Sequence, residues 1–166
     1  MVGPRRVLEQ LPVHPYPAAP SEYHLRVDGL VERSLRLALA DLRTLASAVI
    51  AEDFACLEGW VVPGQEWAGV PLEAVLRAAV PLAGARWVNA SFGEFVLPVP
   101  IGQASDVLLA LSLNGAPLTP EHGAPVRLIV RGGECFTSVK WVDHLLLDAV
   151  PAANTAERIA RARLAR

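Results

Sequence analysis

Lysine is nearly absent from this chain, since only Lys140 among its 15 basic residues is a lysine and the others are arginines. Cysteine is scarce too, with Cys56 and Cys135 the only two. No block of like charge occurs, and the formal net charge is −2. A chain so balanced offers no basic surface that would attract a polyanion. We therefore expect no nucleic-acid partner and no anionic membrane as a partner.

Long apolar runs are also missing. No stretch approaches the roughly 18 residues that suggest a membrane-spanning helix. The N-terminus has an arginine pair, but Glu9, Gln10 and Pro12 interrupt the apolar run that a signal peptide needs. We expect no membrane span and a cytoplasmic location. In that reducing compartment, two cysteines far apart in sequence and without zinc-site spacing are not expected to form a structural disulfide.

The chain has ample material for one core. It contains 166 residues, of which 52% are hydrophobic, and a domain of this length buries roughly two thirds of its unfolded surface. Residues 1–21 hold five prolines and predict an extended strap over the domain. Residues 22–150 form the predicted domain, and residues 151–166 a C-terminal surface helix that Asn154 caps.

Periodicity predicts many short strands and few helices. Alternating or short apolar runs predict strands at 23–27, 35–39, 48–51, 85–90, 94–97, 107–113, 126–130 and 139–147. A helical turn is expected at 40–45, and a helix with an apolar stripe at 70–79, with Pro71 in its first position. A loop is expected at 59–67 and a turn at Asn114-Gly115. Because strands and helices do not alternate regularly, the fold class is α+β, with mixed β-sheets and a few flanking helices.

Cys56 is the first candidate for chemistry. It follows the apolar run 48–51 and precedes the loop that begins at Gly59. A thiol at the end of a strand is held by rigid backbone yet can face a cleft, which suits a soft metal that binds thiolate. The alternative is that Cys56 is a small buried hydrophobic residue, as isolated cysteines often are.

A second group of residues has the character of an anion site. Arg127 interrupts an apolar strand and needs an anionic partner, and two glycines, Gly132 and Gly133, let backbone N–H groups approach a ligand. Lys140 adds a compact positive charge, so together these residues predict a phosphate site. The alternatives are an ordinary Gly-Gly turn with solvated cations and, for His122, a surface histidine in a turn.

Six segments in a fixed order resemble one known family. They are Tyr23…Val27-Asp28-Gly29-Leu30-Val31; Asp53-Phe54-Ala55-Cys56 with Gly59-Trp60; Trp67-Ala68-Gly69-Val70-Pro71-Leu72; Leu113-Asn114-Gly115-Ala116-Pro117-Leu118; His122-Gly123-Ala124-Pro125-Val126-Arg127-Leu128; and Ser138-Val139-Lys140-Trp141. The ordered set closely resembles the molybdopterin-binding domain of the sulfite oxidase superfamily. The resemblance covers about residues 22–148 and implies a sulfite oxidase-like fold around one pterin cofactor.

The resemblance also implies roles for individual residues. Cys56 matches the cysteine that ligates molybdenum, or tungsten in its place. His122, Arg127, Ser138 and Lys140 match positions that contact the pterin or its phosphate. The implied activity is oxygen-atom transfer on a small substrate, with a separate electron-carrier protein as redox partner.

Several positions depart from the family pattern. Ala55 stands where many small relatives have histidine, Cys135 replaces a glycine, and Thr137 replaces a lysine. No arginine closely follows Cys56, so we expect a substrate other than sulfite. Two rival functions remain: a ligand-binding module that kept the fold without the chemistry, and a redox protein that uses Cys56 and Cys135 as a reversible thiol pair.

Overall fold

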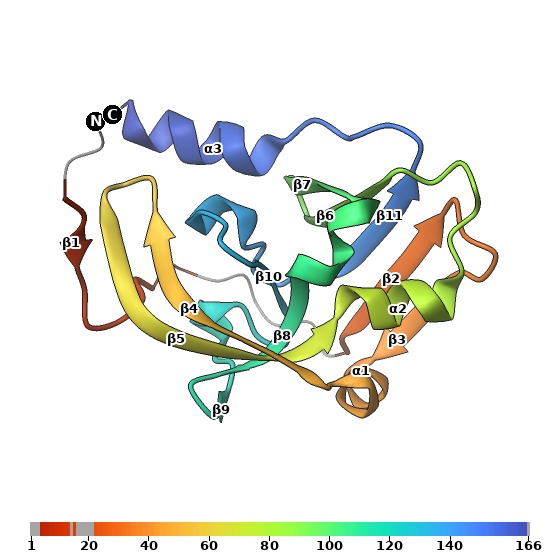
Figure 1. Ribbon diagram of the computed structural model, residues 1–166, viewed down its shortest axis with the longest axis horizontal. Helices are drawn as coiled ribbons and strands as arrows, with labels where there is room; N and C mark the ends of the chain where they lie inside the picture. Colours follow the sequence, from red (N-terminus) through yellow and green to blue (C-terminus); the bar gives the residue numbers. More distant parts are fainter. Residues whose placement is uncertain (1–3, 14, 16–21, 166) are drawn as a thin grey trace.

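Two β-sheets and a few helices make up the domain (Figure 1). The computed structural model describes residues 4–13, 15 and 22–165. One sheet contains β1 (Arg6–Val7), β4 (Ala48–Cys56), β5 (Trp60–Pro71), β8 (Val107–Leu113), β9 (Ala116–Pro117) and β10 (Arg127–Val130). The other contains β2 (His24–Gly29), β3 (Leu35–Ala38), β6 (Trp87–Phe92), β7 (Phe95–Pro100) and β11 (His144–Asp148).

Both sheets are mixed. The first has the order β1-β5-β8-β10, with β4 paired to β5 and β9 to β8, and the second has the order β3-β2-β11-β6-β7. Most neighbours are antiparallel, but β1 runs parallel to β5 and β11 parallel to β2. This architecture confirms the predicted α+β class with mixed sheets.

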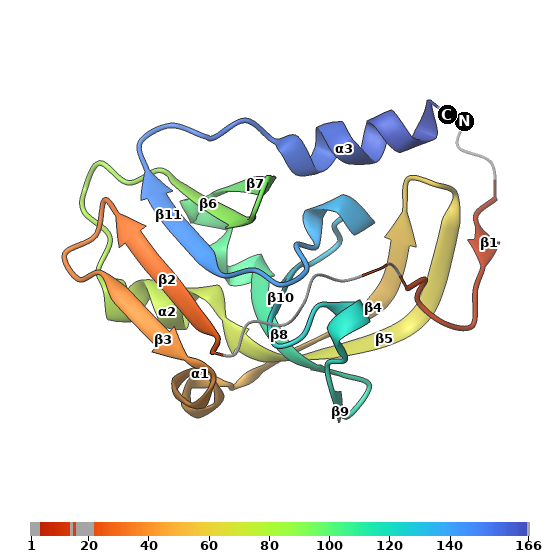
Figure 2. The same cartoon turned by 180° about the vertical axis from the view of Figure 1, so that it is seen from behind.

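In the described part of the chain, three α-helices and three short 3₁₀ helices flank the sheets. They are α1 (Leu39–Leu45), α2 (Leu72–Ala79), α3 (Thr155–Leu164), η1 (Ile101–Asp106), η2 (Pro120–His122) and η3 (Cys135–Thr137). The predicted apolar stripe of α2 is buried. The helix begins at Leu72, so Pro71 occupies the N-cap position rather than the first helical position predicted for it. The predicted cap of α3 is confirmed, since the Asn154 side chain accepts a hydrogen bond from the Glu157 N–H at 2.9 Å. Helix α3 packs on β7 and η3 (Figure 2).

The segment predicted as a loop at 59–67 is a strand. Strand β5 forms a long hairpin with β4, and Trp60, Val62 and Trp67 face the core. Proline and glycine at 63–64 suggested a loop, but the hairpin shifts register opposite them, between Glu52 and Phe54. A bulge of this kind accommodates both residue types inside a strand.

The last strand also differs from its prediction. The sequence predicts it over 139–147, whereas β11 begins at His144. Ahead of it the chain turns, and Trp141 has a left-handed backbone with φ of 57°. Apolar Val139 and Val142 are buried, so the apolar pattern reflects burial in a turn rather than a strand.

The N-terminal segment follows the hairpin. Arg6 pairs with Trp60 and Val7 with Val61 through β1, and Leu11 is buried. The extended strap is predicted over residues 1–21, of which residues 1–3, 14 and 16–21 lie outside the described residues.

Buried apolar side chains form two clusters. The larger joins the second sheet to α2 and the inner faces of β8 and β10. The smaller lies under the β4–β5 hairpin and contains Phe54, Cys56, Trp60 and Trp67. Among the described residues, no helix is long and apolar enough to cross a membrane. The smaller cluster supports the wall on which the candidate site lies.

Candidate active site

Cys56 is the last residue of β4, and the hairpin fixes its position. It pairs with Trp60 across the hairpin, and its carbonyl accepts a hydrogen bond from the Gly59 N–H at 3.0 Å. Gly59 has φ of 83°, a left-handed conformation that glycine adopts without strain. The Cys56 side chain is 4% exposed. Its sulfur is thus placed by rigid backbone, as the strand-end position predicts.

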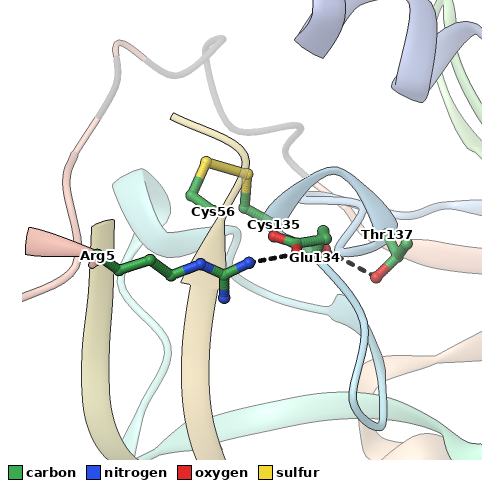
Figure 3. Close-up of polar contacts among 5 residues, drawn as sticks. All are labelled: Arg5, Cys56, Glu134, Cys135 and Thr137. Carbon is green, nitrogen blue, oxygen red and sulfur yellow. Dashed lines mark hydrogen bonds and ion pairs between the residues drawn. A yellow bond between two sulfur atoms is a disulfide. The ribbon is translucent and has the colours of Figure 1, made fainter. Parts of the chain in front are cut away.

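The sulfur of Cys56 forms a disulfide with Cys135 (Figure 3). The expectation that these two cysteines form no disulfide is therefore wrong. The two cysteines are far apart in sequence, but a parallel bridge between Ala55 and Glu134 brings their chain segments side by side. The next residue on each side is a cysteine, and the two Cα atoms lie 4.7 Å apart.

Arg127 is a buried cation without a carboxylate partner among the described residues. Its Nε donates to Ser138 Oγ at 2.5 Å, and its Nη1 donates to the His122 carbonyl at 3.2 Å. The guanidinium lies over two neighbouring rings, 5.1 Å from the Phe54 centroid and 5.0 Å from the Trp67 centroid. Burial lowers the pKa of Arg127 to about 9, so it is cationic at neutral pH. A buried charge is costly unless an opposite charge approaches it, so the site favours an anion.

Two further groups beside Arg127, Lys140 and His122, also favour the binding of an anion. The Lys140 ammonium donates to the Glu121 carbonyl at 2.7 Å, and burial, together with the nearby cations Arg127 and Arg163, lowers its pKa to about 8. His122 has a buried Nδ1 without a hydrogen-bond partner in the described structure. Burial and then the charges of Arg127 and Lys140 lower the pKa of His122. We call Arg127, His122, Ser138 and Lys140 the anion cluster.

The anion cluster and the cysteine pair meet at one pocket of about 520 Å³. Cys56 and Cys135 line it, as do Arg127, Ser138 and Lys140. Six aromatic side chains complete much of the wall: Phe54, Trp60, Phe92, Phe95, Phe136 and Trp141. Four of the seven predicted site residues are thus brought together, and His122 adjoins them through its carbonyl.

The two predicted glycines lie apart from this pocket. The Gly132 N–H donates to both oxygens of the Glu52 carboxylate at 3.0 Å, and the Gly133 N–H donates to the Val130 carbonyl at 3.0 Å. Both N–H groups are therefore occupied within the protein, and neither glycine lines the pocket. This turn does not offer the open N–H pair that the phosphate prediction invoked.

The sequence did not point to α3 as part of the site. Ile159, Ala160 and Arg163 of this helix line the pocket, as does Glu94 from the turn before β7. The only available signal was the row of arginines in the tail, which a solvated helix explains equally well. The structure adds one cation, Arg163, and two carboxylates, Glu58 and Glu94, to the predicted site residues.

Together, these features define a mixed-sheet domain in which one cysteine sulfur faces a set of groups that favour an anion. The residues match a known family: the model of the oxidoreductase molybdopterin-binding domain covers residues 11–155. The chain belongs to this family, whose name implies a molybdenum-pterin cofactor, and it has the sulfite oxidase-like fold.

Individual relatives agree with this assignment. The chain is 32% identical to sulfite oxidase of Gallus gallus, over 81% of this chain and 37% of that protein. It is 29% identical to a nitrate reductase (NADPH) of Beauveria bassiana, over 84% of this chain and 19% of that protein. A crystal structure of the sulfane dehydrogenase SoxCD from Paracoccus pantotrophus superimposes with a TM-score of 0.73 at 28% identity, over 78% of this chain and 39% of that one. The chain therefore spans well under half the length of these three relatives.

The electrostatics of Lys140 predict a pH effect on stability. In the unfolded chain this lysine keeps its proton up to its ordinary pKa of 10.5, whereas the folded protein releases it near 8. Between these values the unfolded state binds more protons, so this group makes the free energy of unfolding rise as pH rises from about 8 to 10. Chemical denaturation of the wild type and of Lys140→Met should show a steeper rise in the wild type. Arg127 is present in both proteins, so parallel curves would contradict the burial argument for Lys140.

Proposed function

We propose that the chain is an oxidoreductase that binds a molybdenum-pterin cofactor, or its tungsten analogue, and transfers an oxygen atom to or from a small substrate. The observation that carries the proposal is the shared pocket, which is lined by Cys56 and by three members of the anion cluster, Arg127, Ser138 and Lys140. The bound group supplies the two-electron oxygen-atom transfer. The protein supplies its position, its charge environment and shelter from water.

The pocket residues suit both the phosphate end and the metal end of a molybdenum-pterin cofactor. The anion cluster offers a buried guanidinium without a carboxylate partner in the described structure, a half-buried ammonium and an unpartnered Nδ1 of His122. These groups suit a phosphate, to which arginine donates paired hydrogen bonds. Cys56, once reduced, offers the soft thiolate that a molybdenum or tungsten centre favours. Arg127, Ser138, His122 and Lys140 would hold the anionic end, and Cys56 the metal end.

The redox partner is proposed to be a separate electron-carrier protein, and the compartment the cytoplasm. Cytoplasmic thiol systems keep cysteine pairs reduced, which leaves the Cys56 sulfur free. Aromatic side chains around the pocket reduce its access to water. We further propose that neither a nucleic acid nor a membrane is a partner.

The second candidate is a module that binds an anionic ligand without catalysis. The disulfide favours it, because a sulfur bonded to Cys135 carries no thiolate. The two candidates differ in one measurable property. The enzyme turns over an oxygen-donor or oxygen-acceptor substrate with an artificial electron donor or acceptor, and the binding module does not.

The pocket's remaining charges predict which substrate is preferred. If the cofactor phosphate takes Arg127 and Lys140, the charges left in the lining are Glu58, Glu94 and Arg163. The Glu58 carboxylate accepts a hydrogen bond from Trp60 Nε1 at 3.1 Å, which fixes it beside the strand end. A carboxylate near the reaction centre opposes an approaching anion. We therefore expect a neutral sulfoxide or N-oxide to be preferred over sulfite.

Steady-state assays of the cofactor-loaded, reduced enzyme test this preference. Glu58→Gln should raise kcat/KM for sulfite about tenfold relative to a neutral sulfoxide, which corresponds to about 1.4 kcal/mol. The matched control is Glu66→Gln, an exposed carboxylate on β5 and outside the pocket lining. An unmodified enzyme that oxidises sulfite at about 10⁴ M⁻¹s⁻¹ or faster would overturn the charge argument.

A further inference from the structure

Two chain segments that are distant in sequence bring the cysteines together. Strand β4 ends at Cys56, η3 begins at Cys135, and the residues just before them, Ala55 and Glu134, form a parallel bridge. The resulting Cα separation of 4.7 Å lies within the range of native disulfides. The backbone of both segments therefore places the two cysteines within pairing distance.

The η3 segment is also held by contacts that do not involve sulfur. Glu134 accepts from Arg5 Nη2 at 2.6 Å, which ties it to the N-terminal segment (Figure 3). The Thr137 hydroxyl and the Thr137 N–H both donate to the Glu134 carbonyl, at 2.8 and 2.9 Å. Because these contacts persist when the disulfide opens, the two thiols should remain neighbours and able to close again.

Both cysteines lie in the wall of the pocket that the proposed metal would enter. Cys56 is only 4% exposed, so small reagents reach the sulfur pair from the pocket side. The pair thus lies where its oxidation state decides what Cys56 can bind. Metals ligate the thiolate form of cysteine, and a disulfide sulfur has no thiolate to give.

We propose that Cys56 and Cys135 form a redox gate on the cofactor pocket. Closing the disulfide withholds the metal ligand, and opening it admits the cofactor. This inference rests on the proposed function, since it treats Cys56 as the ligand. It assigns to Cys135 a role of its own, that of a resolving thiol.

Closing the disulfide requires an oxidant, and opening it requires a reductant. In closing, the two thiols lose two protons and two electrons to a hydroperoxide, whose O–O bond breaks to give an alcohol and water, while the S–S bond forms. In opening, a dithiol reductant attacks the S–S bond, transfers its two thiol protons to Cys56 and Cys135, and leaves as its own disulfide.

The test uses the full chain purified without cofactor and prepared in three forms. These are wild type oxidised with hydrogen peroxide, wild type reduced with a phosphine and desalted without air, and Cys135→Ser reduced in the same way. Each is incubated with molybdenum-pterin cofactor released from a molybdoenzyme. Intact mass after alkylation counts free thiols, elemental analysis gives molybdenum per chain, and circular dichroism checks the fold.

The gate predicts no alkylated thiol and less than about a tenth of the molybdenum in the oxidised wild type, relative to the reduced one. Treating the oxidised sample with phosphine should restore both thiols and the loading. Cys135→Ser, whose Cys56 cannot pair with a second cysteine of the chain, should load when reduced and should show an oxidised Cys56 but no intramolecular disulfide by mass after mild peroxide treatment.

The possible outcomes distinguish failure of the redox gate from failure of the proposed function. Equal molybdenum in the oxidised and reduced wild type, with the disulfide verified by mass, overturns the gate and leaves the function standing. Two alkylated thiols after peroxide also overturn it. No molybdenum in the reduced wild type or in reduced Cys135→Ser, with the fold intact, overturns the proposed function and the gate together.

Discussion

Replacing both Cys56 and Cys135 with serine should lower the molybdenum content, remove one sulfur from the coordination of the metal that stays bound, and abolish oxygen-atom transfer. Cys56→Ser alone is a weaker test, because Cys135 is left as a free thiol with its Cα 4.7 Å from that of residue 56. The neighbouring thiol can take the place of the lost ligand. The double variant removes this substitute, and X-ray absorption counts the sulfur atoms that remain.

Cys135→Ser is the matched control for this experiment. It keeps Cys56 and loses only the neighbour, so its sulfur count should equal that of the reduced wild type. A double variant that retains the wild-type sulfur count, with pterin and metal bound, would show that the metal takes no ligand from Cys56.

Removing the two cations of the anion cluster should have an effect of similar size on cofactor binding. Arg127→Met keeps much of the side-chain volume over Phe54 and Trp67 while deleting the charge, and Lys140→Met does the same at the pocket wall. Hydrogen bonds to a charged partner contribute about 1.5–3 kcal/mol each. The double variant should therefore lose at least about a hundredfold in cofactor affinity, since each 1.4 kcal/mol is tenfold.

Arg131→Met is the control for charge alone. Arg131 directly follows β10, is exposed and lies outside the pocket lining. Its loss removes one positive charge, as each single substitution in the anion cluster does, but should leave pterin content unchanged. Full cofactor occupancy in Arg127→Met, Lys140→Met, measured by pterin fluorescence in folded protein, would place the phosphate elsewhere.

Local sequence patterns predicted the elements whose residues interact over short distances. The stripe of α2, the cap at Asn154 and the turn at Asn114-Gly115 each depend on a few neighbouring residues. They were predictable because helix periodicity, capping chemistry and positive φ leave clear local marks. The position of Cys56 at a strand end belongs to the same group.

Features that depend on distant pairing were not predictable in the same way. Whether 63–64 is a loop or a bulge is decided by the partner strand near Asp53, whose carboxylate accepts the Gly64 N–H at 2.9 Å. The neighbouring positions of Cys56 and Cys135 depend on a single bridge between chain segments far apart in sequence. Gly132 looked free to bind an anion, but Glu52 from β4 already accepts its N–H.

The anion cluster was only partly predictable from the sequence. Arg127 stood out because it interrupts an apolar strand, and Lys140 because it is the only lysine. Their resemblance to family positions then linked them to a pterin phosphate. Only the structure showed that Arg127 lacks a carboxylate partner among the described residues and that α3 brings Arg163 toward the same pocket.

Molybdenum and pterin analysis of the reduced full chain, purified from a host that makes the cofactor, tests the central claim most directly. Stoichiometric metal and pterin are expected in the wild type and in Cys135→Ser, together with loss of the pterin in Arg127→Met, Lys140→Met. Folded, reduced wild-type protein that contains neither metal nor pterin would contradict the central claim.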